Sequence, residues 1–235
     1  MSGLPDILLA AVTGFGCALF FSSIPVGPIN LTIINEGSQR GFKWAWFIGF
    51  GASIMEAIYC ALSFTGFSSF FGNPGVKAVM EVLTFVFLLF LGAKFLFVQS
   101  VNLPATPLRA AAEKIEARLE QKLHPRSAFL IGFVRVMGNL GVFLFWIVLT
   151  GNFMSHDWVA DALWPKAACV GGVALGTNAW FFALCFAVSR GHGRFSEATL
   201  LRLQRLSGVC LLVVGLFDGT HIVWQLARHR MALTS

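Results

Sequence analysis

Charged residues are scarce in this chain. Asp, Glu, Lys and Arg make up 12% of its 235 residues, about half the share in a typical soluble domain, and Tyr occurs once. Hydrophobic residues instead make up 57%, with 25 Phe, and apolar runs long enough to cross about 30 Å of hydrocarbon recur along the chain. The composition argues against a soluble globular domain and predicts an all-α, polytopic membrane protein.

Motifs of cysteine and histidine chemistry are also missing. The five cysteines all fall within predicted membrane spans, with no CxxC pair and no His at metal-ligand spacing: Cys17, Cys60, Cys169, Cys185 and Cys210. We interpret them as small hydrophobic residues packed between helices, not as disulfide partners or metal ligands. No Lys or Arg precedes the first apolar run, which argues against a cleaved signal peptide.

Six apolar stretches have the length of membrane spans. Their approximate bounds are Ile7–Ile34, Phe42–Phe64, Val76–Val98, Ser127–Leu149, Trp164–Val188 and Leu206–Leu226. The chain then divides into a first three-helix repeat at 1–98, a cytoplasmic linker at 99–126 and a second three-helix repeat at 127–235.

Basic residues are unevenly distributed between the loops. The loops on one side hold Arg40, Lys43, Arg109, Lys114, Arg118, Lys122, Arg126, Arg190, Arg194, Arg202 and Arg205, and those on the other hold Lys77, Lys166, Arg228 and Arg230. Loops rich in Lys and Arg stay cytoplasmic. The net charge of +6 therefore indicates topology and not nucleic-acid binding. We predict a multi-pass membrane protein with both termini on the outer side.

The linker is predicted to contain an amphipathic helix. Thr106 and Pro107 are a typical helix start, and Pro125 ends the helix. One apolar stripe lies between a basic and an acidic flank, which suits a helix on the inner membrane surface. A solvated linker helix is the equal alternative.

The two halves carry an internal repeat. The sequence "EAIYCAL" at 56–62 matches "NAWFFAL" at 178–184, and "LLFLG" at 88–92 matches "LLVVG" at 211–215. Since three spans are an odd number, the two halves enter the membrane in opposite directions. Such a 3+3 inverted repeat is typical of secondary transporters, whose binding site lies near the midplane between the repeats.

The first and fourth spans are each interrupted by glycine and polar residues. "SSIPVGPINL" at 22–31 contains Pro25, Gly27, Pro28 and Asn30, and "FVRVMGNLGVFLFW" at 133–146 contains Gly138, Asn139 and Gly141. A proline inside a helix leaves a carbonyl without its partner, which a membrane tolerates only where protein or a wet cavity receives it. We predict two broken helices that meet across a pseudo-two-fold axis and form a site. A kink that only improves packing is the alternative.

Three motifs in the first half form one pattern: "IPVGPINL", "QRGFKWAWFIGFGASIMEA" and "FLGAKFLF". With them the chain resembles the LysE/RhtB family of bacterial amino-acid exporters. The resemblance maps the family's break to Gly27 and Pro28 and its acidic position to Glu56. It implies amino-acid export driven by the proton-motive force, with no metal or organic cofactor, across a bacterial inner membrane, so that both termini would lie in the periplasm. The chain departs from the family at Asn139-Leu140, where Asn-Pro is usual, and at Arg135.

Glu56 is the main candidate for the site. It lies near the middle of the second span, where a charge costs at least ~2.5–3.5 kcal/mol and needs a reason. Its carboxylate can bind a proton or a substrate ammonium group. The carbonyls freed at Pro25 and Pro28, together with Asn30, would add further acceptors. A structural ion pair with Arg135 is the alternative.

Other polar residues complete the predicted site. Asn139 and Asn178 would supply the second half's share. Arg135 would hold a substrate carboxylate with two hydrogen bonds, or else snorkel to the inner surface. Asp218 and His221 share one face of the last span, where they could relay protons or make an interface contact.

Three other functions fit the pattern less well. Export of a metal cation or inorganic ion would need clustered acidic, His or Cys ligands, and a thiol–disulfide carrier would need a cysteine beside each break. A non-transporting scaffold would place no polar groups at the midplane. We therefore predict a secondary exporter of amino acids or similar small zwitterions, not an enzyme. Its partners would be the small-molecule substrate, protons and the lipid bilayer, and a homodimer is one option for its oligomeric state.

Overall fold

The computed structural model describes residues 3–22, 28–71 and 127–190, together with isolated residues between 75 and 97 and between 201 and 220. Its helices are α1 (Leu4–Ser22), α2 (Pro28–Arg40), α3 (Phe42–Phe71), α6 (Ala128–Met137), α7 (Leu140–Ser155) and α8 (Leu163–Arg190). This part of the chain contains no strand, which confirms the predicted all-α class. The predicted amphipathic helix of the linker lies outside the described residues.

Several helices have the length and composition of membrane spans. Within the described residues, α1, α3 and α8 are each long and apolar enough to cross a membrane, and α6 with α7 forms a fourth, bent span. Helix α3 continues to Phe71, beyond the predicted end at Phe64. The third and sixth predicted spans are described only at isolated positions. Two of these positions pack together, because a Cβ at Gly92 would lie 2.7 Å from Cγ of Leu212.

Both predicted interruptions are present. The first span is divided into α1, which ends at Ser22, and α2, which begins at Pro28. A proline is well suited to that first helical position, because an N–H there has no partner within the helix. Residues 23–27 of the interruption lie outside the described residues.

The fourth span bends by 67° between α6 and α7. Asn139 causes the restart: its side-chain oxygen accepts hydrogen bonds from the backbone N–H groups of Gly141, at 3.1 Å, and Val142, at 3.4 Å. The Met137 carbonyl at the end of α6 accepts a 2.6 Å hydrogen bond from the Tyr59 hydroxyl of α3. Side chains therefore satisfy backbone groups that an unbroken helix would pair internally.

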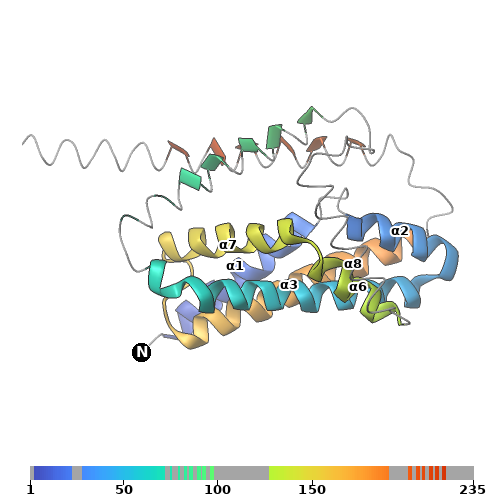
Figure 1. Cartoon of the computed structure of the whole chain (residues 1–235), viewed down its shortest axis with the longest axis horizontal. Coiled ribbons are helices and arrows are strands. Elements are labelled where there is room, and N and C mark those ends of the chain that lie inside the picture. Colours follow the sequence, from blue (N-terminus) through green and yellow to red (C-terminus); the bar gives the residue numbers. More distant parts are fainter. Residues whose placement is uncertain are drawn as a thin grey trace, which may run out of the picture.

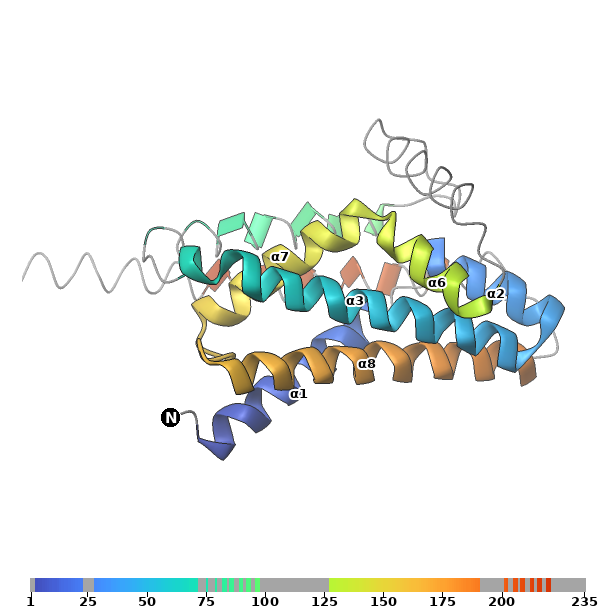
Figure 2. The ribbon, with the colours of Figure 1, turned by 60° about the horizontal axis from the view of Figure 1, so that its bottom comes forward.

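The two halves of the chain pack as an inverted repeat. Helices α3 and α8 run antiparallel through the centre (Figure 2). Helix α1 packs along α8, and its counterpart α6 packs along α3. In the same way α7 contacts α3, and α2 contacts α8 (Figure 1). Exchanging the halves thus converts the α1–α8 pair into α6–α3 and the α2–α8 pair into α7–α3, as the sequence repeat predicts.

Glycines allow the broken spans to approach the central helices closely. On the α1–α8 contact, a Cβ added at Gly172 would lie under 3.0 Å from the Ala11 carbonyl oxygen, and one at Gly176 equally near the Phe15 oxygen. On the α3–α6 contact, a Cβ at Gly132 would overlap the backbone of Ile48 in the same way. Gly172 and Gly176, spaced as GxxxG, therefore serve close packing of helices.

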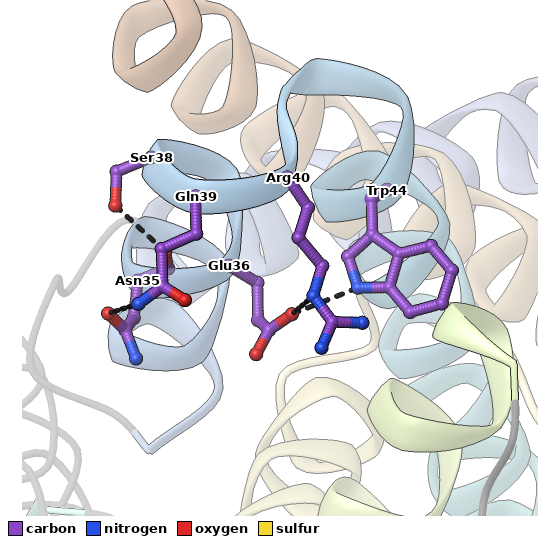
Figure 3. Close-up of polar contacts among 6 residues, drawn as sticks. All are labelled: Asn35, Glu36, Ser38, Gln39, Arg40 and Trp44. Carbon is purple, nitrogen blue, oxygen red and sulfur yellow. Dashed lines mark hydrogen bonds and ion pairs between the residues drawn. The ribbon is translucent and has the colours of Figure 1, made fainter.

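A tight turn joins α2 to α3. Gly41 adopts φ +85°, a left-handed conformation that glycine enters without steric cost. Beside the turn, the Glu36 carboxylate accepts a 3.0 Å hydrogen bond from the Trp44 indole and lies 3.2 Å from Nε of Arg40 (Figure 3). The Arg40 guanidinium also lies over the Trp44 ring, 4.9 Å from its centroid. These contacts fix the hairpin at the end of the bundle where α8 also ends (Figure 2).

Candidate functional site

Glu56 lies at the middle of the 30-residue helix α3. At about 1.5 Å per residue α3 is about 45 Å long, so the carboxylate is far from both of its ends. Helix α3 contacts α2 of its own half and α6, α7 and α8 of the second half. The Glu56 side chain, which is only partly exposed, is therefore placed where the two halves of the bundle meet.

Two buried donors face the Glu56 carboxylate. They are the Thr177 hydroxyl of α8 and the Trp146 indole N–H of α7. Thr177 is 0% exposed and Trp146 is 1% exposed. Neither donor atom has a partner at ordinary hydrogen-bond geometry in the described part of the chain. Both groups thus approach the carboxylate without completing a hydrogen bond to it.

Thiol groups lie beside this cluster. Cys60, one helical turn after Glu56, contacts Cys169 of α8, which in turn lies near Cys17 of α1. All three are free thiols, and Cys60 and Cys169 are fully buried. They pack between helices as small apolar residues, as the sequence predicts.

Asn30 bridges the interruption of the first span. Its side-chain nitrogen donates to the Ser22 carbonyl at the end of α1, at 3.2 Å, and its side-chain oxygen accepts from the Trp180 indole of α8, at 3.1 Å. The side chain is 3% exposed. Asn30 therefore connects α1, α2 and α8 across the break.

Asn178 makes a second hydrogen bond between a tryptophan and an asparagine of different helices. Its side-chain oxygen accepts a 3.2 Å hydrogen bond from the Trp46 indole of α3. One tryptophan–asparagine bond therefore runs from α8 to α2, and another runs from α3 to α8. These two bonds tie α2 and α3 to α8, and the bond from Asn30 to Ser22 ties α2 to α1.

The remaining predicted residues are divided between helix ends and undescribed positions. Asn139 caps α7, and the Arg135 guanidinium donates to the Thr32 hydroxyl of α2. Pro28 is the first residue of α2. Gly27, Asp218 and His221 lie outside the described residues.

The sequence did not identify Trp146 and Thr177 as residues of the site. Trp146 lies in the uniformly apolar run "VFLFWIVL" at 142–149, where nothing distinguishes it from a lipid-facing residue. Thr177 directly precedes Asn178, the repeat-mate of Glu56, and this neighbourhood could have identified it. Its approach to Glu56 depends on how α3 crosses α8, which the pattern of one helix does not give.

A multi-pass helical bundle with two interrupted spans in an inverted repeat is the architecture of a secondary transporter. The chain belongs to the LysE type translocator family, which it matches over residues 20–219. It is also similar to a Bacillus subtilis (strain 168) protein described as "Putative amino acid efflux protein YcgF", with 27% identity over 205 residues, or 87% of this chain and 92% of that protein. No solved structure matches the chain.

Proposed function

We propose that this protein exports amino acids or similar small zwitterions from the cytoplasm in exchange for protons. The observation that carries the proposal is the Glu56 carboxylate, at the middle of α3, faced by two buried donors. A carboxylate inside a membrane bundle is costly and marks a substrate or proton pathway by default. The Bacillus subtilis relative is described as an amino acid efflux protein, which supports amino acids as the substrate class.

Exchange follows if the proton and the substrate compete for one group. Ionised Glu56 can accept a substrate ammonium group from the cytoplasmic side, and protonation from the outside releases that group. The neutral carboxyl then returns and loses its proton inward. Because Glu56 cannot hold a proton and an ammonium group together, outward solute movement is coupled to inward proton movement.

The interruptions complete the proposed pathway. Backbone carbonyls near Gly27 and Pro28 would offer acceptors to the ammonium group as it reaches or leaves Glu56. Asn30 and Asn178 would break and reform their tryptophan hydrogen bonds as the cytoplasmic side opens and closes. Asp218 and His221 would carry protons only if Glu56 does not.

An export assay tests the substrate class. Cells without their own amino-acid exporters would express the protein and be fed dipeptides, which raise internal amino-acid levels. We expect at least one amino acid to accumulate in the medium several-fold faster than from cells with an empty vector, and a protonophore to reduce that difference. Equal release from both cells, with the protein present in the membrane, would contradict the proposal.

The proposed orientation places the protein in the bacterial inner membrane with both termini in the periplasm. The support is the concentration of Lys and Arg in the loops on one side of the bundle. In a variant without native cysteines, Glu116→Cys is expected to resist a membrane-impermeant maleimide in intact cells and to react after permeabilisation. Asp161→Cys, at an exposed position of the α7–α8 loop, is the matched control and should react in both cases. Labelling of Glu116→Cys in intact cells would show that the protein has the opposite orientation.

A further inference from the structure

Two buried donors at the centre of the bundle have no satisfied partner. The Trp146 indole nitrogen and the Thr177 hydroxyl oxygen are each fully enclosed, and neither makes a hydrogen bond of ordinary geometry within the described residues. Leaving one such group unpaired costs about 1–3 kcal/mol. Buried polar atoms are nearly always paired, so each exception requires an explanation.

Their chemistry restricts what can satisfy them. An indole N–H can only donate, so the group that pairs with Trp146 must be an acceptor. Thr177 can also donate to that acceptor. A carboxylate, with two oxygens and about four lone-pair sites, can accept from both groups at once.

The position of Glu56 restricts the ligand further. Its carboxylate lies against the same two donors, so an acceptor and a pair of donors meet at one place. A ligand with only a carboxylate would be repelled by ionised Glu56, and a metal cation or a polyamine would leave the donors unpaired. A ligand whose ammonium and carboxylate groups are joined through one carbon satisfies all three residues.

We propose that Trp146 and Thr177 form the carboxylate-binding half of the substrate site, while Glu56 binds the ammonium group, so that the site selects α-amino acids. This inference rests on the proposed function and assigns two specificity-determining residues within it. It also gives Arg135 a different place from the one predicted, because the Arg135 guanidinium is engaged with Thr32 of α2.

Binding of matched ligands tests this assignment. Purified protein in lipid nanodiscs would bind a tritiated mixture of the common L-amino acids. The competitors would be the unlabelled mixture, the corresponding methyl esters, which keep the ammonium group, and the N-acetyl derivatives, which keep the carboxylate. In the wild-type protein only the free amino acids are expected to compete strongly.

Each variant removes one donor: Thr177→Val keeps the shape of the side chain, and Trp146→Phe keeps an aromatic ring but loses part of the buried volume. Thr177→Val and Trp146→Phe are expected to weaken the binding of free amino acids about tenfold, the effect of one hydrogen bond to a charged group. Binding of the methyl esters should change less than about threefold, because the esters lack the charged acceptor. Thr177→Ser keeps the hydroxyl and should keep the wild-type preference for free amino acids over esters.

Each outcome decides the proposal. If both variants weaken the binding of free amino acids and the binding of esters equally, the two residues act only in packing. That result would overturn the inference but leave the proposed export intact. Failure of Thr177→Ser to keep the preference would overturn the role of the hydroxyl. If the wild-type protein binds none of the labelled amino acids, the proposed function fails, and this inference fails with it. Size-exclusion profiles of all variants check that each is folded.

Discussion

Glu56→Gln is expected to abolish export driven by a pH gradient in proteoliposomes, with a loss of at least about a hundredfold. Glutamine keeps the size of the side chain and its acceptor oxygen, but it cannot take up a proton or balance the charge of an ammonium group. The loss of the charge–charge contact alone weakens binding by roughly 1.5–3 kcal/mol, and the loss of titration removes the coupling itself. The measurement is amino-acid efflux from preloaded vesicles after an imposed pH jump.

Glu36→Gln is the matched control for this substitution. Glu36 is also a carboxylate on a described helix, but it lies at the end of the bundle, paired with Arg40 and Trp44. Such a partly exposed ion pair contributes about 0–1 kcal/mol, so transport by Glu36→Gln should stay within about twofold of the wild type. If Glu56→Gln exports at the wild-type rate, Glu56 is structural, and the proton site must be sought at Asp218 and His221.

The interruptions of the first and fourth spans could be predicted because their signals are local. Pro28 and Gly138 act on their own backbone, and Asn139 accepts from N–H groups only two and three residues ahead. The charge of Glu56 is a local signal too, since a carboxylate in an apolar span is visible without knowing its neighbours. The inverted pairing of helices followed from the repeat and from the odd number of spans.

The partners of the polar residues could not be predicted in the same way. Trp46 and Trp180 lie in apolar helices that each contain a second tryptophan, and nothing in the sequence joins them to Asn178 and Asn30. Those pairs depend on the rotation of α8 against α2 and α3, and that rotation is set by packing of the whole bundle. For the same reason the sequence could not predict that Trp146 lies beside Glu56, because that proximity depends on how α7 packs against α3.

Glycine packing of α1 against α8 gives the second large effect. Gly172→Ala is expected to lower the melting temperature of the purified protein by several degrees and to reduce its yield in the membrane. The added Cβ would overlap the Ala11 carbonyl oxygen and lie 2.9 Å from the Phe15 nitrogen. Both neighbours are backbone atoms that cannot rotate away, so α1 has to move outward as a body. Overpacking of this kind costs about 1–3 kcal/mol. Thermal unfolding followed by size-exclusion chromatography with fluorescence detection measures it.

Gly171→Ala separates this clash from the general effect of replacing a glycine in a helix. Gly171 is adjacent in α8, but a Cβ there meets nothing within 4 Å. Alanine is favoured over glycine in helices by about 1 kcal/mol, so Gly171→Ala should be as stable as the wild type or more stable. The two variants differ only in the direction of one methyl group. If both lower the melting temperature equally, the close contact of α1 with α8 is not what Gly172 provides, and the packing of the first broken span must be described differently.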